Sequence, residues 1–524
     1  MKSRIIIFSI LFLLFSFGDI GKITAQIKKR QDKQLILKAD KAFDFGDYFG
    51  ALKMYESLYL LDSTDTETNF KLGVCSFEIK KSRANAKKYL NKVPLAEFPE
   101  VAYYLGRLNH LSKDFDKATY YYNQYKYFGA ENEHSGKEVD DLIEKCNTAK
   151  SFEANSDKSI VIKNIGNTIN SEHAEYVPLI PADESFMVFT SRRNNPIWKK
   201  MDPLGDFYED IYVSKKDNSG NWSAPVILDT TINTAVHDAC TGLSADGEKL
   251  LLYRTSKDMK SGDIYESFYK DQKWSKPEIL SDVVNSPEYL ETSACYSPNG
   301  DIIFFSSNRP GGFGGKDLYL SRKLQNGKWG KPFNLGPTIN TEYDEDAPFV
   351  HPLGNILYFS SEGHTNMGGY DIFKSTFDEA GKFSEAKNLG SPINTVDDDI
   401  FFVMNTDASK GYLSSDREGG FGLQDIYSVT FPANNLPLNV YNIHVVDAAE
   451  NIVNDVELRV TDVQKKLLIG VYKSNNKTGK VLVIAVPKKE YEISITADGY
   501  EPFETKVELD KIVDLSFKIG NKTK

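Results

Sequence analysis

Acidic side chains are the residues of this 524-residue sequence best suited to chemistry, because they recur at one point of a repeated pattern. One acid lies just before each of five predicted inner strands: Glu175, Asp238, Glu291, Asp346 and Asp399. If these carboxylates ring the mouth of a channel, they would bind a cation such as calcium or steer a basic segment of a partner. The alternative is a solvated rim in which each carboxylate bonds the amides of its own turn.

A second set of acids begins another strand of each repeat. Its members are Asp210, Asp263, Asp317, Asp371 and Asp425, at steps of 53, 54, 54 and 54 residues. A residue needed once for catalysis would not have to appear five times. We therefore interpret these aspartates as structural acceptors for turn amides before a strand.

Three arginines, Arg193, Arg309 and Arg417, occupy equivalent places after the second strand of their repeats. Three guanidinium groups that converge would clamp a carboxylate ligand. The alternative, which we favour, is that each arginine pairs with an acid of its own or the neighbouring repeat.

The glycine-rich stretch FSSNRPGGFGGKDLYLS (Phe305–Ser321) suggests a phosphate loop, but the spacing excludes one. Pro310 stands where the first glycine of a P-loop belongs, and Asp317 replaces its magnesium-binding hydroxyl. A phosphate loop also opens a helix, whereas DLYLS alternates as a strand does. We interpret the stretch as a turn between two strands, with glycines that supply positive φ angles.

Signatures of catalysis and of zinc binding do not occur. There is no Gly-x-Ser-x-Gly elbow, no His-Glu-x-x-His helix and no Cys-x-x-Cys pair. The four cysteines (Cys75, Cys146, Cys240 and Cys295) are expected to be buried free thiols, with Cys75 and Cys146 the one pair worth testing for a disulfide. We expect no enzyme, no catalytic residue and no cofactor, apart from a structural calcium ion at the ring of acids.

Length and composition indicate a folded chain of several domains. The chain is 40% hydrophobic and 12% aromatic, which suits β-rich structure. Its formal charge of −11 argues against nucleic acid as a partner. Residues 1–25 combine a basic start, an apolar run and a small residue at Ala25, as a secretory signal peptide does. The apolar run is too short for a membrane span, so we expect an exported protein.

Residues 26–150 show helical periodicity and an internal repeat. Leu72-Gly73 and Leu105-Gly106 are 33 residues apart, and FGDYFGALKMY resembles SKDFDKATYYY. This pattern resembles the tetratricopeptide repeat and predicts an α-helical solenoid.

Residues 151–433 contain five copies of a four-strand unit, which predicts a five-bladed β-propeller, with six blades as the alternative. The fifth copy lacks its outer strand, and Ser159–Ile165 precedes the first copy in the position of one. We therefore expect the leading strand to complete the last blade and close the ring.

Two domain families are suggested by these residues. The Ser-x-Arg…Gly-Gly…Asp-Ile-Tyr pattern resembles the WD40-like (PD40) repeat of TolB-type propellers. Residues 434–524 alternate apolar and polar positions as a small β-sandwich does. Within them, Tyr491-x-Ile493 and Ala497-x-Gly499-Tyr500 resemble the carboxypeptidase regulatory-like fold, which carries no peptidase chemistry.

The order of these segments resembles PorE-type accessory proteins of type IX secretion and gliding motility. This resemblance implies a non-catalytic periplasmic scaffold, peripheral to the outer membrane, whose partners are outer-membrane and periplasmic proteins. The cell surface is the alternative location. That family usually ends in an OmpA-like domain, which this chain does not contain, so peptidoglycan binding is not expected. The alternative functions are a TolB-like propeller that binds a peptide or glycan in its channel, and a glycan hydrolase.

Overall fold

The computed structural model describes residues 32–128, 134–195, 197–202, 206–217, 219–257, 261–378, 380–432, 438–475, 478–510 and 514–522. The predicted signal peptide, residues 1–25, lies outside the described residues. The chain divides into two compact units, Met1–Ile143 with Met201–Asp206, and Glu144–Lys200 with Phe207–Lys524.

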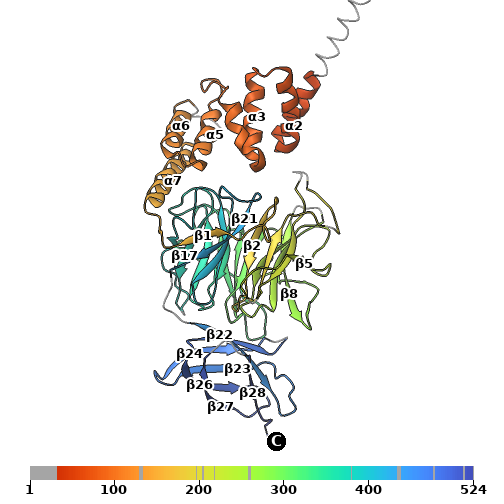
Figure 1. Cartoon of the computed structure of the whole chain (residues 1–524), viewed down its shortest axis with the longest axis vertical. Helices are drawn as coiled ribbons and strands as arrows, with labels where there is room; N and C mark the ends of the chain where they lie inside the picture. The colour runs from red at the N-terminus through yellow and green to blue at the C-terminus, as the bar shows by residue number, and fades with distance from the viewer. Residues whose placement is uncertain are drawn as a thin grey trace, which may run out of the picture. The chain divides into compact units, whose positions relative to one another are not determined.

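The first unit is helical. Among the described residues its helices are 32–44, α2 (Tyr48–Leu61), α3 (Thr66–Glu78), the 3₁₀ turn η1 (Lys80–Ser82), α4 (Arg83–Leu90), α5 (Glu100–Leu111) and α6 (Phe115–Phe128), and α7 (Gly136–Ala154) continues into the second unit. Figure 1 shows these helices in the orange part of the chain. None of the described helices combines the length and the apolar character that crossing a bilayer requires.

The Leu-Gly pairs mark the points where these helices touch. A Cβ atom on Gly73 of α3 would lie 2.4 Å from the side chain of Leu90 in α4. One on Gly106 of α5 would lie 2.5 Å from the Tyr122 ring in α6. The two glycines therefore have the same role in successive helix pairs: without a side chain, each lets a residue of the next helix pack against its own helix. The tetratricopeptide assignment itself stays a prediction.

The second unit contains five antiparallel sheets built from consecutive strands. The first runs β2 (Glu175–Leu179), β3 (Phe186–Ser191), β4 (Asp210–Lys215), β5 (Val226–Ile227). The second runs β6 (Asp238–Leu243), β7 (Lys249–Thr255), β8 (Gly262–Lys270), β10 (Glu278–Ile279), with β9 (Lys273–Trp274) also paired to β8. The third runs β11 (Glu291–Tyr296), β12 (Ile302–Ser307), β13 (Asp317–Arg322), β14 (Phe333–Asn334). The fourth runs β15 (Glu345–Val350), β16 (Ile356–Ser361), β17 (Asp371–Thr376), β18 (Lys387–Asn388).

The fifth sheet joins the two ends of this region. It runs β19 (Asp399–Met404), β20 (Lys410–Ser415), β21 (Asp425–Thr430), β1 (Val161–Asn164). The leading strand β1 pairs antiparallel with β21, from Val161 opposite Thr430 to Asn164 opposite Tyr427 (Figure 1). The prediction that the leading strand completes the last sheet is confirmed, and the arrangement is of the propeller type.

A repeated asparagine connects neighbouring sheets. Its side chain both donates to and accepts from the backbone of one strand residue in the preceding sheet, as an added strand would. The pairs are Asn233 with Ile211, Asn285 with Ile264, Asn340 with Leu318, Asn394 with Ile372 and Asn170 with Ile426. The last pair links the fifth sheet back to the first, so the same contact runs round the whole ring.

The glycine-rich loops pack each sheet against the next. A Cβ atom on Gly314 would lie 2.3 Å from the carbonyl oxygen of Tyr343, and one on Gly422 would lie 1.8 Å from that of His173. The expectation that these glycines supply positive φ angles is only partly right. Gly311 and Gly419 have φ of +87° and +88°, whereas Gly314 and Gly422 serve close approach between sheets.

Two further sheets follow the ring. One has the order β25 (Lys480–Ala485), β22 (Asn439–Val446), β28 (Asp514–Lys518), and the other β24 (Leu467–Lys473), β23 (Glu457–Asp462), β26 (Lys489–Thr496), β27 (Phe503–Leu509). Side chains of both sheets, such as Tyr441 and Ile493, share one buried cluster. All four cysteines of the chain are buried and free, as predicted.

Candidate functional site

The acids that begin the inner strands are buried between structural partners. Glu175 accepts hydrogen bonds from the Ser171 N–H (2.5 Å) and from the hydroxyls of Ser171 (2.7 Å) and Ser191 (2.6 Å). The equivalent carboxylates of Asp238, Glu291 and Asp399 are also almost fully buried and accept the corresponding backbone N–H groups of their own sheets. Burial of this kind leaves little carboxylate surface for a cation in solvent.

The arginines after the second strands pair with these acids. Arg193 lies 3.1 Å from Glu175, Arg309 lies 3.0 Å from Glu291, and Arg417 lies 2.5 Å from Asp399. Arg309 and Arg417 also donate to backbone carbonyl groups of their own repeats, at Val284 and Ile393. The three guanidinium groups therefore hold their own sheets together and do not converge on one ligand.

The fourth sheet departs from this pattern and corrects the predicted set of acids. The buried acid at the start of its inner strand is Glu345, one residue before the predicted Asp346. Glu345 accepts hydrogen bonds from the Thr341 N–H and from the Thr341 and Ser361 hydroxyls, and the residue after Glu362 is Gly363, not arginine. Burial, uncompensated by a cation, raises the pKa of Glu345 to about 7.

The second set of aspartates begins the third strands and contacts the loops before them. Asp317 accepts from the N–H groups of Phe313 (2.7 Å) and Gly314 (3.1 Å), and Asp425 accepts likewise from Phe421 and Gly422. Asp371 accepts from the Met367 N–H. In the first sheet Asp210 accepts instead from the Asn195 side chain, and burial raises its pKa to about 7. Burial also raises the pKa of Asp263.

Positions that differ from sheet to sheet gather at the same end of the ring. The residue before the third-strand aspartate is Glu209 in the first sheet, Lys316 in the third and Tyr370 in the fourth. The second residue of the inner strand is Tyr176 in the first sheet and Asp346 in the fourth. Framework residues recur in every sheet, so a site for one particular ligand has to be built from residues that occur once.

Lys316 and Asp346 form the most enclosed of these contacts. The Lys316 Nζ lies 2.5 Å from Asp346 and 3.4 Å from Asp344. The hydroxyls of Thr292 and Ser293 in the third sheet also donate to Asp346. Burial alone would raise the pKa of Asp346, but Lys316, the Ser293 hydroxyl and the Ala347 N–H outweigh it and the pKa is lowered. Asp346 is therefore a carboxylate at neutral pH.

A second acid beside it behaves in the opposite way. Burial, together with the charges of Asp344 and Asp398, raises the pKa of Glu362. The Tyr370 hydroxyl donates to Asp344 at 3.3 Å. Burial, with the charges of Asp346 and Glu362, raises the pKa of this tyrosine. An acid of lowered pKa and an acid of raised pKa therefore both act electrostatically on this tyrosine.

Another polar cluster joins the first and second sheets. The Tyr176 hydroxyl donates to Glu209, and the Nδ1 atom of His237 lies 3.2 Å from the same carboxylate. Burial alone would raise the pKa of Glu209, but His237 and Tyr176 outweigh it and lower the pKa. The Tyr176 ring stacks on Phe401 with centroids 6.3 Å apart, which connects this cluster to the inner strand of the fifth sheet.

One group of carboxylates among the described residues has oxygens near enough to share an ion. Asp397, Asp398 and Asp416 place one oxygen each within 4.8 Å of one another. None of the three belongs to the predicted set of acids. Acidic groups of this kind are common in proteins that bind no ion, so their proximity alone does not indicate a metal site.

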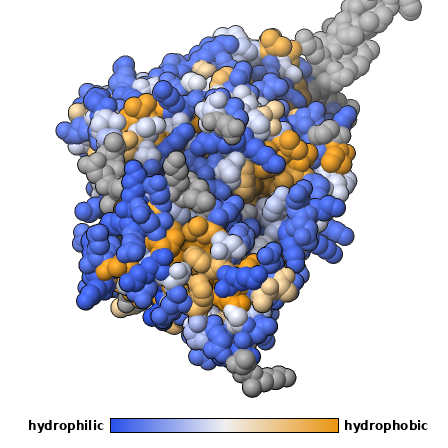
Figure 2. Space-filling model, turned by 60° about the horizontal axis from the view of Figure 1, so that its bottom comes forward, coloured by the Kyte–Doolittle hydropathy of each residue, from blue (hydrophilic) through white to orange (hydrophobic). Residues whose placement is uncertain are grey.

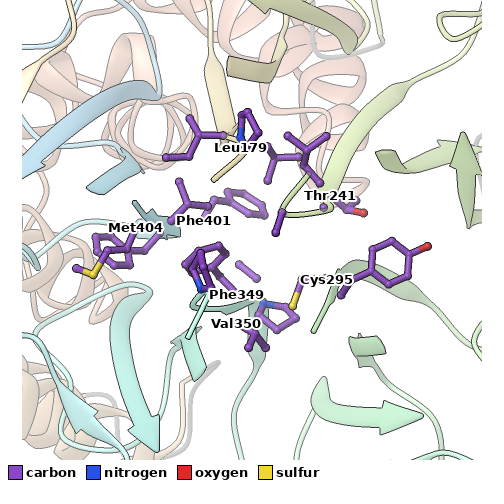
Figure 3. A pocket seen from close by; sticks show the side chains of 18 of the residues that line it. Leu179, Thr241, Cys295, Phe349, Val350, Phe401 and Met404 are labelled. Carbon is purple, nitrogen blue, oxygen red and sulfur yellow. The ribbon is translucent and has the colours of Figure 1, made fainter. Parts of the chain in front are cut away.

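The inner strands enclose a cavity of about 50 Å³, which we call the channel cavity. Figure 3 shows side chains from all five inner strands gathered around it, with Phe349 and Phe401 toward its middle. The labelled residues come from β2 (Leu179), β6 (Thr241), β11 (Cys295), β15 (Phe349, Val350) and β19 (Phe401, Met404). Among the described residues that line it, none carries a charge.

Unusual backbone turns aim side chains into this cavity. Val177, Ala347 and Phe401 are the third residues of their inner strands and have φ of +53°, +52° and +59°. Each lies at a register shift between its strand and the next. Such a φ is a rare conformation for a valine or a phenylalanine and costs energy, so the bulge is a built feature of the channel wall.

One hydroxyl of the cavity wall has no partner. The Oγ1 atom of Thr241 is buried without a hydrogen bond, and its residue is 8% exposed. A buried hydroxyl without a partner loses its hydrogen bond to water, so it favours a ligand that supplies one. The sequence analysis predicted a channel between the inner strands but not Thr241 or the apolar lining, because strict alternation does not foresee the bulges that set these side-chain directions.

No protein-family model and no curated protein sequence matches the chain. Solved structures with a similar fold include a putative TolB from Agrobacterium tumefaciens, at 16% identity over 52% of this chain and 98% of that one, with a TM-score of 0.29. Another is an endo-arabinase from Bacteroides thetaiotaomicron, at 14% identity over 51% and 97%, with a TM-score of 0.34. A third is a GH43 β-xylosidase/α-arabinofuranosidase from a compost metagenome, at 13% identity over 56% and 96%, with a TM-score of 0.34.

These matches correct two expectations from the sequence, that the chain is a non-catalytic scaffold and that it is not an enzyme. The matching structures include glycoside hydrolases and a TolB-type protein. The low identities and TM-scores transfer no activity or substrate to this chain. Its function has to be argued from its own residues.

Proposed function

We propose that this chain is a ligand-binding propeller protein that holds a peptide in the channel between its five inner strands. An apolar side chain of the peptide would enter the channel cavity. The observation that carries this proposal is the uncharged wall to which every inner strand contributes. Burying apolar surface there is favourable by about 25 cal/mol per Å².

The lining of the cavity favours a peptide over a glycan. Each hydroxyl of a sugar needs a hydrogen-bond partner when it leaves water, and an unmet one costs about 1–3 kcal/mol. The Thr241 hydroxyl offers one such partner. An apolar peptide side chain needs no hydrogen-bond partner, so the Thr241 hydroxyl is left for the adjoining backbone amide. The cavity volume of about 50 Å³ suits one side chain.

This proposal includes a finer view of the fold. It takes the five sheets as the blades of one closed five-bladed propeller and the two C-terminal sheets as a β-sandwich. The pairing of β1 with β21 and the shared buried cluster of the C-terminal sheets support this view. Export of the chain, inferred from residues 1–25, remains part of the proposal.

Selection of peptides tests this function. A random heptapeptide library would be panned on the full chain, and selected peptides titrated calorimetrically against Thr241→Val and the matched control Thr190→Val. Thr190 is a buried threonine whose hydroxyl accepts the Cys240 N–H and does not line the cavity. We expect the peptides to share one apolar residue and to bind Thr241→Val at least fivefold more weakly, with Thr190→Val unchanged. Peptides without a common apolar residue would overturn the proposal.

The acids around Tyr370 favour a second candidate function, glycoside hydrolysis. Hydrolysis of a glycosidic bond uses one protonated and one ionised carboxyl group, and environments that push two pKa values apart identify such pairs. Glu362 would donate its proton to the leaving oxygen as the glycosidic bond breaks. The Asp346 carboxylate would accept a proton from the water molecule whose oxygen forms the new bond to the anomeric carbon. Tyr370 would contact the sugar between them.

Chromogenic glycosides test this second function. The full chain would be assayed with p-nitrophenyl arabinofuranoside and xyloside, beside Glu362→Gln and Asp346→Asn. We expect release of nitrophenol by the wild type and a loss of at least a hundredfold in each variant. Glu418→Gln, which replaces an exposed glutamate of the fifth sheet, is the control and should keep full activity. Absence of hydrolysis with both glycosides would remove this candidate.

A further inference from the structure

Strand β24 (Leu467–Lys473) is an edge of its sheet. In the order β24, β23, β26, β27 it is hydrogen-bonded to β23 on one side, among the described residues. The backbone N–H and C=O groups on its other side are therefore available to another strand.

The side chains of this edge are apolar and exposed. Leu467 is 56% exposed, Leu468 44%, Ile469 38% and Val471 37%. Natural edge strands are usually protected by inward charges, prolines or covering loops. Strand β24 contains no proline, and its one charged residue is Lys473 at its end. The pairing with β23 shifts register at Ile469, so the protection of this edge is limited to one lysine and one bulge.

A cavity lies along this strand inside the second unit. It measures about 440 Å³, and Leu467, Ile469 and Val471 form one wall. Pro298 and Leu353 of the third and fourth repeats contribute to the opposite wall. Figure 2 shows apolar side chains gathered on the face that it brings forward, within mostly hydrophilic surroundings. An extended segment placed on β24 would therefore bury its side chains on this apolar surface.

Basic side chains border the strand. Lys465 and Lys466 precede it, both exposed, and Lys473 ends it with its Nζ 3.7 Å from Asp301. Lys465, Lys473 and Lys480 also line the cavity. Of the acids that line it, Asp462 lies 3.3 Å from Lys489 and Asp246 accepts from Asn475, so both have local partners. The excess of positive charge favours an occupant with acidic residues at its ends.

We propose that β24 binds an extended segment of a partner protein as an added strand, and that this segment has apolar residues in its centre and acidic residues at its flanks. Main-chain hydrogen bonds to the open edge would give affinity, and the apolar wall and the lysines would select the segment. This site is separate from the channel cavity and does not depend on the function proposed for it.

The test uses a synthetic peptide of alternating valine and threonine with two glutamates at each end, carrying a fluorescent label. Its binding to the full chain is followed by anisotropy. A second peptide has alternate backbone nitrogens methylated, which removes hydrogen bonds and keeps the side chains. Ile469→Lys places a charge on the edge, and Ile279→Lys in β10 is the matched control, an exposed isoleucine on the edge strand of the second sheet.

We expect the first peptide to bind the wild type and Ile279→Lys equally, and Ile469→Lys at least tenfold more weakly. The methylated peptide should also bind at least tenfold more weakly, and amide exchange in residues 467–473 should slow when the first peptide is bound. Equal binding of the two peptides, or no binding, would overturn the proposal. The proposal would also be overturned if Ile469→Lys abolished self-association of the chain, or its binding to neutral phospholipid vesicles, and left peptide binding unchanged.

Discussion

Asn170 holds Ile426 by two hydrogen bonds, although 256 residues separate them in the chain. The Asn170 Nδ2 donates to the Ile426 carbonyl at 2.9 Å, and the Ile426 N–H donates to the Asn170 Oδ1 at 3.0 Å. Both residues are buried. An equivalent pair of bonds is present at each of the four other interfaces between neighbouring sheets. The contact of Asn170 with Ile426 therefore makes the interface between the fifth and first sheets equivalent to the rest.

Removing this side chain should open the ring. Asn170→Ala leaves the Ile426 N–H without a partner, whereas the Ile426 carbonyl keeps the bond from the Ile165 N–H, so we expect a cost of about 1–3 kcal/mol in the free energy of unfolding. Urea denaturation measures this loss, and amide exchange should quicken in β1 and β21. Asn233→Ala breaks the equivalent bonds to Ile211 and should cost a similar amount, but with faster exchange in β4. Unchanged stability of Asn170→Ala would contradict this role.

The unpaired acid of the fourth sheet should make stability depend on pH. Burial raises the pKa of Glu345 from 4.5 to about 7, so the folded state keeps its proton where the unfolded state has lost it. The stabilisation is complete below pH 4.5 and is lost as the pH rises through 7. Glu345→Gln has no proton to lose. The difference in the free energy of unfolding, variant minus wild type, should therefore increase by up to about 3 kcal/mol from pH 4 to pH 8.

The equivalent acid of the first sheet provides the control. Glu175→Gln removes the partner of Arg193, whose guanidinium lies 3.1 Å away. Breaking such a pair leaves a mostly buried cation, so we expect a loss of about 3 kcal/mol at pH 7. The Glu→Gln change in the free energy of unfolding should therefore have opposite signs above pH 7 for the two acids, a loss where the acid pairs with arginine and a gain where it does not. A loss of stability in both variants at pH 8 would show that Glu345, like Glu175, has a cationic partner in the folded protein.

The sequence predicted the order of the strands correctly but not the exact acid in each inner strand. The 54-residue period and the missing outer strand were enough to predict the pairing of β1 with β21. The acid of the fourth inner strand was misplaced by one residue because Asp344, Glu345 and Asp346 are consecutive. Alternation does not choose among three neighbouring acids, and only the register opposite Ser361 selects Glu345.

Features that depend on a neighbouring sheet were beyond prediction. Gly314 is required because the Tyr343 carbonyl of the next sheet lies where a Cβ atom would be. The channel cavity depends on the left-handed backbone of Val177 and Phe401, two residues that rarely adopt it. The polar cluster around Tyr370 combines Lys316 and Asp346 from different sheets. Asp346 was a candidate acid of the channel mouth, but no sequence pattern pairs it with Lys316.

Backbone strain in the channel wall can be measured at Ala347, whose φ is +52°. A left-handed conformation costs a residue with a Cβ atom about 1–2 kcal/mol, which glycine avoids. Two costs of the substitution oppose this gain: glycine loses more backbone entropy on folding than alanine does, and the buried methyl group is removed. Ala347→Gly should therefore change the free energy of unfolding by less than about 0.5 kcal/mol, whereas Ala294→Gly, at a buried strand residue outside the positive-φ set, should lose about 1–2 kcal/mol. Equal losses in thermal denaturation would mean that Ala347 is unstrained.

Close packing between the third and fourth sheets can be measured at Gly314. A Cβ atom there would lie 2.3 Å from the Tyr343 carbonyl oxygen and 2.5 Å from that of Thr341. Both obstacles are backbone atoms, so Gly314→Ala should cost about 2 kcal/mol or more in urea denaturation. Gly520→Ala meets open space and should change stability by less than about 0.5 kcal/mol. A neutral Gly314→Ala would mean that the two sheets lie farther apart.

The central claim is that the ring is closed by its own leading strand, since the channel cavity exists only if it is. Lys163 and Ser428 are directly opposite in the pairing of β1 with β21. Cysteines at opposite antiparallel positions are near enough for a disulfide. The double variant Lys163→Cys, Ser428→Cys should therefore oxidise completely and denature at a higher temperature than its reduced form. Lys163→Cys with Lys374→Cys, which uses the corresponding strand of the fourth sheet, should not cross-link; cross-linking of this second pair, or none in the first, would contradict the closed ring.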